Sequence, residues 1–235
     1  MKKILSVAAI GLAAMLIAAP AQAASFTNGD FEATDGSQVG TANGINQSAL
    51  GGGNWDVYTS MPGWSSTSTP GFEIQTTGTV PGVTAHSGNK YIELESHPNP
   101  SGTVNIRQVF DVATTGTYKL SFFYQPRTND PGDNLINVIF GTTALAVSGP
   151  SGTFPFGTWT EVIVSTVLYA GVNSGLLEFF ASATPPGLTL GGFIDSVNII
   201  RTGDAPPVPL PAGLILLLSG LAGIGYLGRS RAKAA

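Results

Sequence analysis

The chain contains no cysteine among its 235 residues. It can therefore form no disulfide and has no thiol nucleophile, so packing must hold the fold, with or without a bound metal. Only two histidines are present, His86 and His97, and they do not have the spacing of a metal-ligand pair. The sequence also lacks a Gly-x-Ser-x-Gly element and a glycine-rich phosphate loop. Because these common catalytic signatures are missing, we expect a protein that is not an enzyme.

Positive charge is scarce in the middle of the chain. Half of the ten cations lie near the two ends, at Lys2, Lys3, Arg229, Arg231 and Lys233. Between residues 24 and 207, five cations face all 14 acids, which gives this segment a net charge of −9. Such a surface repels phosphate backbones, so we expect no nucleic-acid partner, and it suits the binding of cations.

The first residues have the pattern of a secretory signal peptide. Lys2 and Lys3 precede an apolar stretch over residues 4–19, and residues 21–23 (Ala-Gln-Ala) offer a small-x-small cleavage site. This order of a basic region, an apolar region and small residues is typical of a cleaved signal helix. We therefore expect residues 1–23 to be removed during export.

A second apolar run lies near the end of the sequence. Residues 210–227 carry no charge and are followed by three cations. As a helix, these 18 residues would extend about 27 Å, close to the thickness of a bilayer's hydrocarbon core. These cations predict that the chain after the helix lies on the cytoplasmic side of the membrane. The pattern predicts one transmembrane helix within residues 205–235.

A short motif opens this run, with the sequence Val208, Pro209, Leu210, Pro211 and Ala212. The motif, the Leu- and Gly-rich run and the terminal arginines together resemble the PEP-CTERM sorting signals of Gram-negative bacteria, in the Val-Pro-Leu-Pro-Ala variant. The better-known form has Glu at the position of Leu210. The resemblance implies recognition and cleavage by an exosortase at the inner membrane, followed by placement at the cell surface or in the extracellular matrix. An ordinary membrane anchor is the alternative.

Residues 24–204 predict a single all-β domain. Gly, Pro, Ser, Thr and Asn interrupt this segment throughout, and no stretch keeps a helical period for three turns. Eight segments have strand character: residues 71–76, 90–95, 103–110, 117–125, 135–140, 159–167, 176–181 and 193–201. Many short strands separated by turn clusters favour a two-sheet jelly-roll sandwich over a barrel or a βαβ fold.

A set of short motifs follows the same order along this domain. They are residues 28–32 (Asn-Gly-Asp-Phe-Glu), 62–64 (Pro-Gly-Trp), 106–110 (Ile-Arg-Gln-Val-Phe), 116–122 (Gly-Thr-Tyr-Lys-Leu-Ser-Phe) and 193–199 (Phe-Ile-Asp-Ser-Val-Asn-Ile). Together they resemble the galactose-binding-like jelly rolls, a fold of many carbohydrate-binding modules and bacterial surface proteins. The resemblance implies that the first and last strands lie close together.

The resemblance also implies a structural calcium site, which we place at Glu32 and Asp195, with Asp30 as a third residue. Two carboxylates in a half-buried site repel unless a cation lies between them, and calcium accepts ligands from distant parts of a chain. The alternative is that Glu32 and Asp195 accept hydrogen bonds from the backbone at strand ends.

Two polar clusters are candidates for ligand binding. Tyr124, Gln125 and Arg127 end a strand, and offer a flat aromatic face and a fork of donors for a sugar. The alternative is that Tyr124 belongs to the core while Arg127 pairs with an aspartate of the following loop, Asp130 or Asp133. The second cluster is expected to line a groove, to bind an ion or to solvate an outer face, and consists of Glu73, Gln75, Glu93 and Glu95.

Two functions are compatible with these features. The first is an exported module that binds glycan, with the producer's own exopolysaccharide as the expected partner. The second is a structural surface or matrix protein without a dedicated ligand site. Aromatic side chains exposed in a groove would favour the first function, and a fully buried aromatic set would favour the second.

Overall fold

The structure, a computed structural model, describes residues 25–34, 42–95, 97, 103–182 and 190–205. The predicted signal peptide and the sorting motif at Val208 to Ala212 lie outside these residues. Within the described ranges, no helix is long and apolar enough to cross a membrane.

The described part is built from β-strands and one short 3-10 helix, η1 (Gln47–Ala49). The strands, in chain order, are β1 (Trp55–Tyr58), β2 (Ser60–Met61), β3 (Trp64–Ser65), β4 (Phe72–Thr76), β5 (Lys90–Glu93), β6 (Thr103–Val112), β7 (Gly116–Gln125), β8 (Ile136–Phe140), β9 (Thr143–Val147), β10 (Thr160–Leu168), β11 (Gly171–Ser182) and β12 (Phe193–Gly203).

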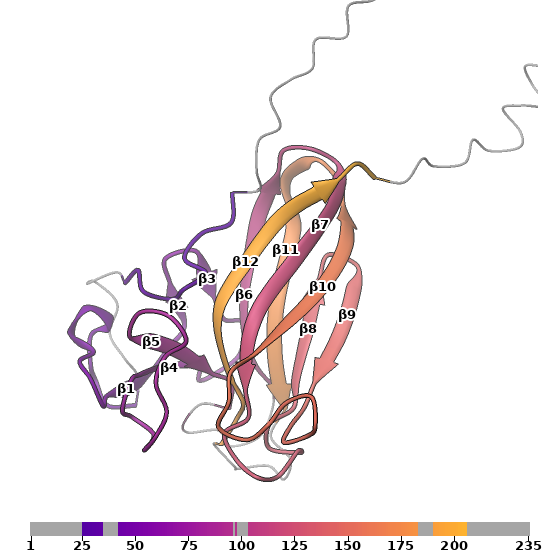
Figure 1. The fold of residues 1–235 in the computed structure, drawn as a ribbon. Helices are drawn as coiled ribbons and strands as arrows, with labels where there is room; N and C mark the ends of the chain where they lie inside the picture. Colours follow the sequence, from indigo (N-terminus) through magenta and orange to yellow (C-terminus); the bar gives the residue numbers. More distant parts are fainter. Residues whose placement is uncertain (1–24, 35–41, 96, 98–102, 183–189, 206–235) are drawn as a thin grey trace, which may run out of the picture.

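The strands form two six-stranded sheets that pack face to face (Figure 1). One sheet has the order β1-β4-β5-β12-β7-β10, and the other has the order β2-β3-β6-β11-β8-β9. Every pairing in both sheets is antiparallel. The protein is therefore a two-sheet jelly-roll sandwich, as the sequence predicts.

All eight strands predicted from the sequence are present, with ends that differ by a few residues. The structure adds four strands that the sequence pattern did not indicate, β1, β2, β3 and β9. Two of these, β2 and β3, have only two residues each, which is too short to show an alternation of apolar and polar side chains.

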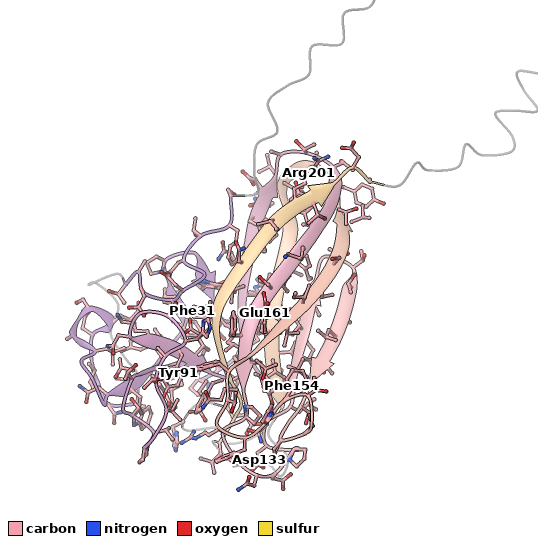
Figure 2. The ribbon with its side chains drawn as sticks, in the orientation of Figure 1. Phe31, Tyr91, Asp133, Phe154, Glu161 and Arg201 are labelled. Atoms are coloured by element: carbon pink, nitrogen blue, oxygen red, sulfur yellow. The ribbon has the colours of Figure 1, made fainter. Side chains whose placement is uncertain are left out.

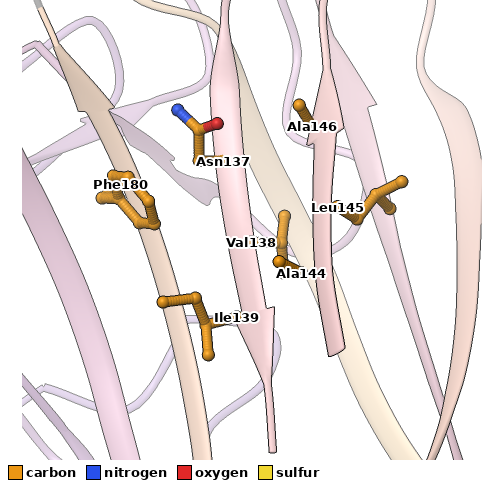
Figure 3. A pocket seen from close by; sticks show the side chains of 7 residues that line it. All are labelled: Asn137, Val138, Ile139, Ala144, Leu145, Ala146 and Phe180. Carbon is orange, nitrogen blue, oxygen red and sulfur yellow. The ribbon is translucent and has the colours of Figure 1, made fainter. Parts of the chain in front are cut away.

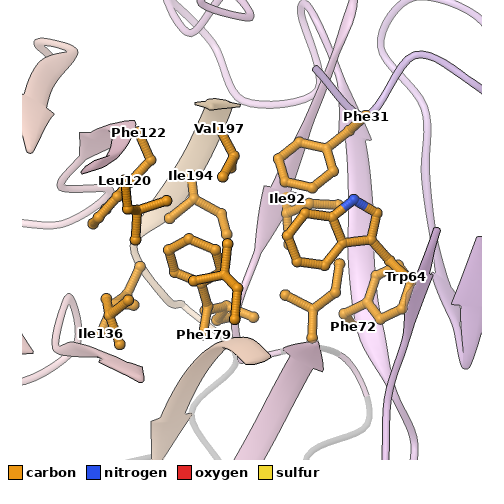
Figure 4. Packing of buried hydrophobic residues seen from close by; sticks show 14 of the residues in the cluster. Phe31, Trp64, Phe72, Ile92, Leu120, Phe122, Ile136, Phe179, Ile194 and Val197 are labelled. Atoms are coloured by element: carbon orange, nitrogen blue, oxygen red, sulfur yellow. The ribbon is translucent and has the colours of Figure 1, made fainter. Parts of the chain in front are cut away.

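The core lies between the two sheets (Figure 4). In β7, alternate residues point into it, and Tyr118, Leu120 and Phe122 are fully buried. Phe179 of the facing sheet packs edge-on against Phe122, with ring centroids 5.0 Å apart. This is the face that the period-2 pattern of residues 118–124 predicts.

The chain that precedes β1 is fastened to the sandwich at several points. Phe31 is completely buried and packs against the Trp64 ring, with centroids 5.4 Å apart. The Val197 amide donates to the Gly29 carbonyl at 2.7 Å. The first segment of the domain therefore lies beside the last strand, as expected. Burying a Phe side chain contributes about 1.5 to 3 kcal/mol, so this contact helps to hold the ends together.

Asp56 of β1 organises the loop that precedes this strand. Its buried carboxylate accepts backbone N–H bonds from Ala42, Asn43 and Ile45 at 2.7 to 2.9 Å. Long loops rich in Gly and Asn are commonly mobile, or ordered by a ligand or an ion. In the described part of this loop, residues 42–54, an internal carboxylate supplies the order instead.

Candidate functional site

Several polar side chains gather on the outer face of the first sheet, the face that points away from the core. The register places Glu73 of β4 directly opposite Glu93 of β5, and Glu93 opposite Phe193 of β12. Phe193 in turn lies opposite Gln125 of β7. Because directly opposed residues of an antiparallel pair share a face, these four side chains form one row across the sheet.

Hydrogen bonds join this row to its neighbours. The Gln75 amide donates to the Glu73 carboxylate at 2.6 Å and also to Glu93. The Tyr91 hydroxyl donates to the amide oxygen of Gln75 at 2.9 Å. We call Glu73, Gln75, Tyr91, Glu93 and Arg127 the outer-face network.

The network is buried, which corrects one sequence interpretation. The sequence left three roles open for these residues: to line a groove, to bind an ion or to solvate an outer face. Glu73, Gln75 and Glu93 are each at most 1% exposed, so the third role is wrong for them. Their side chains are shielded from solvent even though they lie on the face of the sheet that points away from the core. Buried polar groups of this kind are stable when each one has partners, and these three have them.

Arg127 supplies the positive charge of the network. Its guanidinium forms an ion pair with Glu93, which also accepts the Gly191 N–H at 2.8 Å. The same guanidinium lies 5.8 Å from the centroid of the Phe193 ring. The alternative in which Arg127 pairs with Asp130 or Asp133 is not seen among the described ion pairs, because the ion-pair partner of Arg127 is Glu93, a strand residue 34 positions earlier.

Burial shifts the titration of Glu93. Desolvation is the main cause that raises the pKa of this carboxyl well above its ordinary value, and the nearby Glu73 carboxylate adds to the effect. The Arg127 guanidinium acts in the opposite direction, because it favours the ionised form. Arg127 is thus the group that makes an ionised Glu93 tolerable inside the protein.

A pocket of about 210 Å³ lies beside the network. We call it the Phe156 pocket, and it is lined by Val80, Pro81, Gly82, Val83, Gln125, Pro126, Arg127, Phe156 and Gly157. Phe156 is 52% exposed, which is unusual for a large aromatic side chain in this domain. Gln125 and Arg127, two of the three predicted ligand-binding residues, thus line one cavity together with an accessible ring.

The third predicted residue, Tyr124, is a core residue. Its side chain is completely buried, and its hydroxyl donates to the Asn134 carbonyl at 2.7 Å. The ring packs edge-on against Phe154, which Figure 2 labels near one end of the sandwich, with centroids 5.2 Å apart. Tyr124 is therefore not available to a ligand, and assigning it to a binding site was wrong. Strand alternation explains this, since Gln125 and Tyr124 point to opposite faces.

Phe156 was not identified from the sequence. It lies in a turn-rich segment, residues 151–157 (Ser-Gly-Thr-Phe-Pro-Phe-Gly), which has no strand or helix period. The available signal was an aromatic residue among turn formers, since turns lie at the surface and rarely bury every side chain.

A second pocket, of about 280 Å³, lies on the other sheet (Figure 3). It is lined by Asn137, Val138, Ile139, Ala144, Leu145, Ala146 and Phe180. Asn137 and Phe180 lie directly opposite each other on β8 and β11. Among the side chains that line it, only Asn137 can form hydrogen bonds, so this pocket offers less for orienting a polar ligand than the Phe156 pocket does.

The carboxylates predicted to bind calcium lie near one another but contact the backbone. One oxygen of Glu32 accepts the N–H groups of Asn89 and Lys90 at 2.7 and 2.6 Å, and Lys90 Nζ lies 3.3 Å from the other. Asp195 Oδ2 accepts the N–H groups of His86 and Ser87 at 2.8 and 3.0 Å.

These contacts match the alternative interpretation of Glu32 and Asp195. Calcium requires oxygen ligands, whereas the contacts that these carboxylates make in this structure are with N–H groups and an ammonium. Asp30 is exposed and contributes only a 3.4 Å contact with the Glu32 amide. Burial raises the pKa of Asp195 to about 7 against the opposing effect of its backbone hydrogen bonds. Calcium binding by these residues stays a prediction.

The described residues also contain no cluster of three or more His, Cys, Asp or Glu arranged to hold a metal ion. Any cation site in this part of the chain would thus need oxygens from carbonyl groups, hydroxyl groups or water in addition to carboxylates.

The fold and the Phe156 pocket together define a class of protein: a jelly-roll sandwich with a small pocket beside the outer face of one sheet. No family model matches the chain, and no curated protein matches its sequence. Comparisons with solved structures return distant matches, and three of them are given next.

A family 16 carbohydrate-binding module has 13% identity and a TM-score of 0.35, and the match covers 50% of this chain and 80% of that one. A family 35 carbohydrate-binding module from Clostridium thermocellum has 17% identity and a TM-score of 0.35, with 49% and 81% covered. The K1 cleaved adhesin domain of Lys-gingipain from Porphyromonas gingivalis W83 has 12% identity and a TM-score of 0.44, with 64% and 98% covered. These similarities are too low to assign a site or a ligand.

Proposed function

We propose that this protein is an exported surface or matrix protein whose jelly-roll domain binds glycan in the Phe156 pocket. The observation that carries the proposal is the combination of an exposed aromatic ring with a side-chain amide and a guanidinium around one cavity. A sugar ring has apolar C–H faces and a rim of hydroxyl groups, and therefore needs both kinds of contact.

The pocket assigns a role to each of three side chains. Phe156 offers its exposed face to the C–H groups of a sugar, while Gln125 and Arg127 offer N–H donors to its hydroxyl oxygens. The volume of about 210 Å³ is below the range of about 300 to 1,000 Å³ for drug-sized ligands. It therefore suits a single sugar unit of a longer chain. One such unit should give weak binding, of about 4 to 6 kcal/mol, or millimolar to tens of micromolar.

The charge of the domain restricts the partner further. With a net charge of −9 over residues 24–207, the surface repels polyanions. A neutral polysaccharide meets no such barrier, and weak sites act together when a repeating polymer engages many protein copies. We therefore expect a neutral exopolysaccharide of the producing cell as the partner, and no nucleic acid.

A retention experiment tests this function. Phe156→Ala should abolish retention of the domain on the host's exopolysaccharide, because the aromatic face is lost while little buried area changes. Tyr169→Ala is the matched control, since Tyr169 is 62% exposed and follows β10, outside the Phe156 pocket. Equal retention of both variants and the wild type would favour the structural alternative, a surface protein without a ligand site.

Export and sorting form the second part of the proposal. The amino-terminal pattern supports a cleaved signal peptide, and residues 208–235 support exosortase processing at the inner membrane of a Gram-negative bacterium. We expect the mature protein to lack residues 1–23 and to be cut near Pro209 to Ala212. Intact-mass measurement of the protein from its native host tests this. A mature form that retains Arg229 and Arg231 would indicate a plain membrane anchor.

A further inference from the structure

Two exposed apolar side chains lie in one turn, where β10 ends and β11 begins. Val172 is 80% exposed and Tyr169 is 62% exposed, the two highest values among the large apolar side chains of the described residues. Single exposed apolar side chains are common on protein surfaces, whereas neighbouring ones at one tip mark a candidate contact surface. We call residues 169–174 the Tyr169 turn.

Hydrogen bonds hold the Tyr169 turn in one conformation. The Ser174 hydroxyl donates to the Tyr169 carbonyl at 2.8 Å, and the Asp111 carboxylate accepts the Asn173 N–H at 2.7 Å. Asn173 has a φ angle of 51°, a left-handed conformation that Asn adopts more readily than most other residues do. The turn thus presents Tyr169 and Val172 from a fixed backbone, which lowers the entropy lost when they contact another surface.

The turn lies beside the point where the chain leaves the domain. Thr115, between β6 and β7, contacts both segments. Its hydroxyl oxygen accepts the Ala170 N–H at 2.9 Å, and its carbonyl accepts a bond from the Arg201 guanidinium at 3.4 Å. Arg201, near the end of β12, also pairs with Asp204, and Figure 2 labels it at this end of the sandwich. The Tyr169 turn and residue 205 therefore lie at the same end.

The connection to the predicted membrane helix is short. The uncharged apolar run begins at residue 210, five residues after residue 205. Even a fully extended chain of that length reaches no more than about 18 Å. The opposite end of the sandwich lies farther away, since the ten residues of β7 extend about 33 Å as a strand. The end that carries the Tyr169 turn is thus the one that the tether holds near the membrane.

We propose that the Tyr169 turn contacts the lipid surface beside the membrane helix, in the form of the protein that still carries residues 210–227. The inference rests on the proposed function, because it requires that these residues span the membrane. Tyrosine rings favour the boundary between lipid headgroups and hydrocarbon, and Val172 adds an apolar side chain at the same level. The contact orients the domain and keeps residues 208–212 at the membrane surface, where the proposed exosortase acts.

The charges around the turn indicate an apolar contact rather than an electrostatic one. The contacts described above bring Asp111, Arg201 and Asp204 to this end of the domain, and two of these three side chains are acidic. Such a set gives no attraction to anionic headgroups, which basic clusters provide. Lipid contact by this turn should therefore persist at high salt, where an electrostatic contact would be lost.

Fluorescence of the full chain in vesicles of phosphatidylethanolamine and phosphatidylglycerol tests the proposal. Because the chain contains no cysteine, Val172→Cys provides a single position for a nitrobenzoxadiazole label. We expect a blue-shifted emission and strong quenching by nitroxide-bearing lipids. Gly152→Cys is the matched control, since a Cβ there meets no atom within 4 Å and the residue lies in the same connection as Phe156, toward the opposite end. Its label should keep the emission that it has in water and should escape quenching.

A second variant tests the side chain itself. With the label at Ala170→Cys, lipid quenching should fall severalfold when Tyr169→Ser is added. Both positions are exposed, so thermal unfolding should not change. Equal quenching with and without Tyr169→Ser would overturn the role of this ring.

Flotation of the same vesicles separates this inference from the membrane helix. A chain that floats with the vesicles while its Val172 label is as accessible to water as the Gly152 label overturns the contact and leaves the helix in place. A chain that stays in the aqueous fraction overturns both the membrane helix and the contact.

Discussion

Arg127 links the two parts of the candidate site, because it belongs both to the outer-face network and to the wall of the Phe156 pocket. The Arg127 side chain is 17% exposed at the pocket wall, whereas the side chain of its partner Glu93 is fully buried. A ligand in the pocket would therefore meet donors that are already oriented by a buried carboxylate, which lowers the entropy lost on binding.

Replacing Arg127 should destabilise the domain strongly. Arg127→Met leaves Glu93 as a buried charge without compensation, and breaking one side of such a pair costs about 3 to 5 kcal/mol. Urea unfolding measures this loss. The double variant Arg127→Met with Glu93→Gln should recover much of it, because the uncompensated charge is then gone. If the double variant loses as much unfolding free energy as the two single variants lose together, the two side chains are not coupled.

Tyr124 offers a second test at the scale of a residue. Because the ring is completely buried, Tyr124→Ala should lower the free energy of unfolding by about 3 to 5 kcal/mol. Tyr124→Phe removes only the hydroxyl that donates to Asn134 and should cost about 0.5 to 1.5 kcal/mol. Chemical denaturation of both variants checks the values. A stable Tyr124→Ala protein that has lost glycan retention would restore Tyr124 to the binding site.

At the scale of elements, the first segment of the domain depends on contact with β12. A Cβ on Gly29 would overlap the Val197 carbonyl oxygen and approach the Phe26 ring, while the Val197 amide donates to Gly29. Gly29→Ala should therefore force these two segments apart and cost about 1 to 3 kcal/mol. Gly152→Ala is the control, because a Cβ there meets no atom within 4 Å. Equal unfolding free energies for the two variants would contradict the contact.

The long strands could be predicted from the sequence because their pattern is local. In β7, apolar residues at every second position indicate one buried face without reference to the rest of the chain. The strands β2 and β3 could not be predicted, because two residues establish no period and their pairing depends on other strands.

The site was harder to predict than the strands. Acidic residues are almost never fully buried unless they are paired, so the sequence left open whether Glu73 and Glu93 line a groove, bind an ion or solvate an outer face. The pairing partner, Arg127, lies in a loop far along the chain, and only the sheet register brings the two acids together. Gln125 and Arg127 could be named as candidate ligand-binding residues because they lie at the end of a strand that the sequence predicts. Phe156 could not, because it lies in a segment without a strand or helix period.

At the scale of the whole molecule, the two ends of the described domain lie at the same end of the sandwich (Figure 1). Ser25 donates its N–H to the Asp111 carbonyl near the end of β6, and the Asp204 carbonyl accepts from the Thr117 hydroxyl near the start of β7. The Phe156 pocket lies toward the opposite end, since Gln125 ends β7. An anchor that follows residue 205 would thus leave the pocket directed away from the membrane.

The most direct test of the account is a two-dimensional ¹H–¹⁵N spectrum of the domain, residues 24–204, titrated with neutral oligosaccharides prepared from the host's exopolysaccharide. We expect fast-exchange shifts concentrated on the amides of residues 80, 82, 83, 125, 127, 156 and 157, which line the Phe156 pocket. Shifts concentrated instead on residues 137–139, 144–146 and 180 would move binding to the pocket of the other sheet. A spectrum that does not change at millimolar oligosaccharide would contradict glycan binding by this domain.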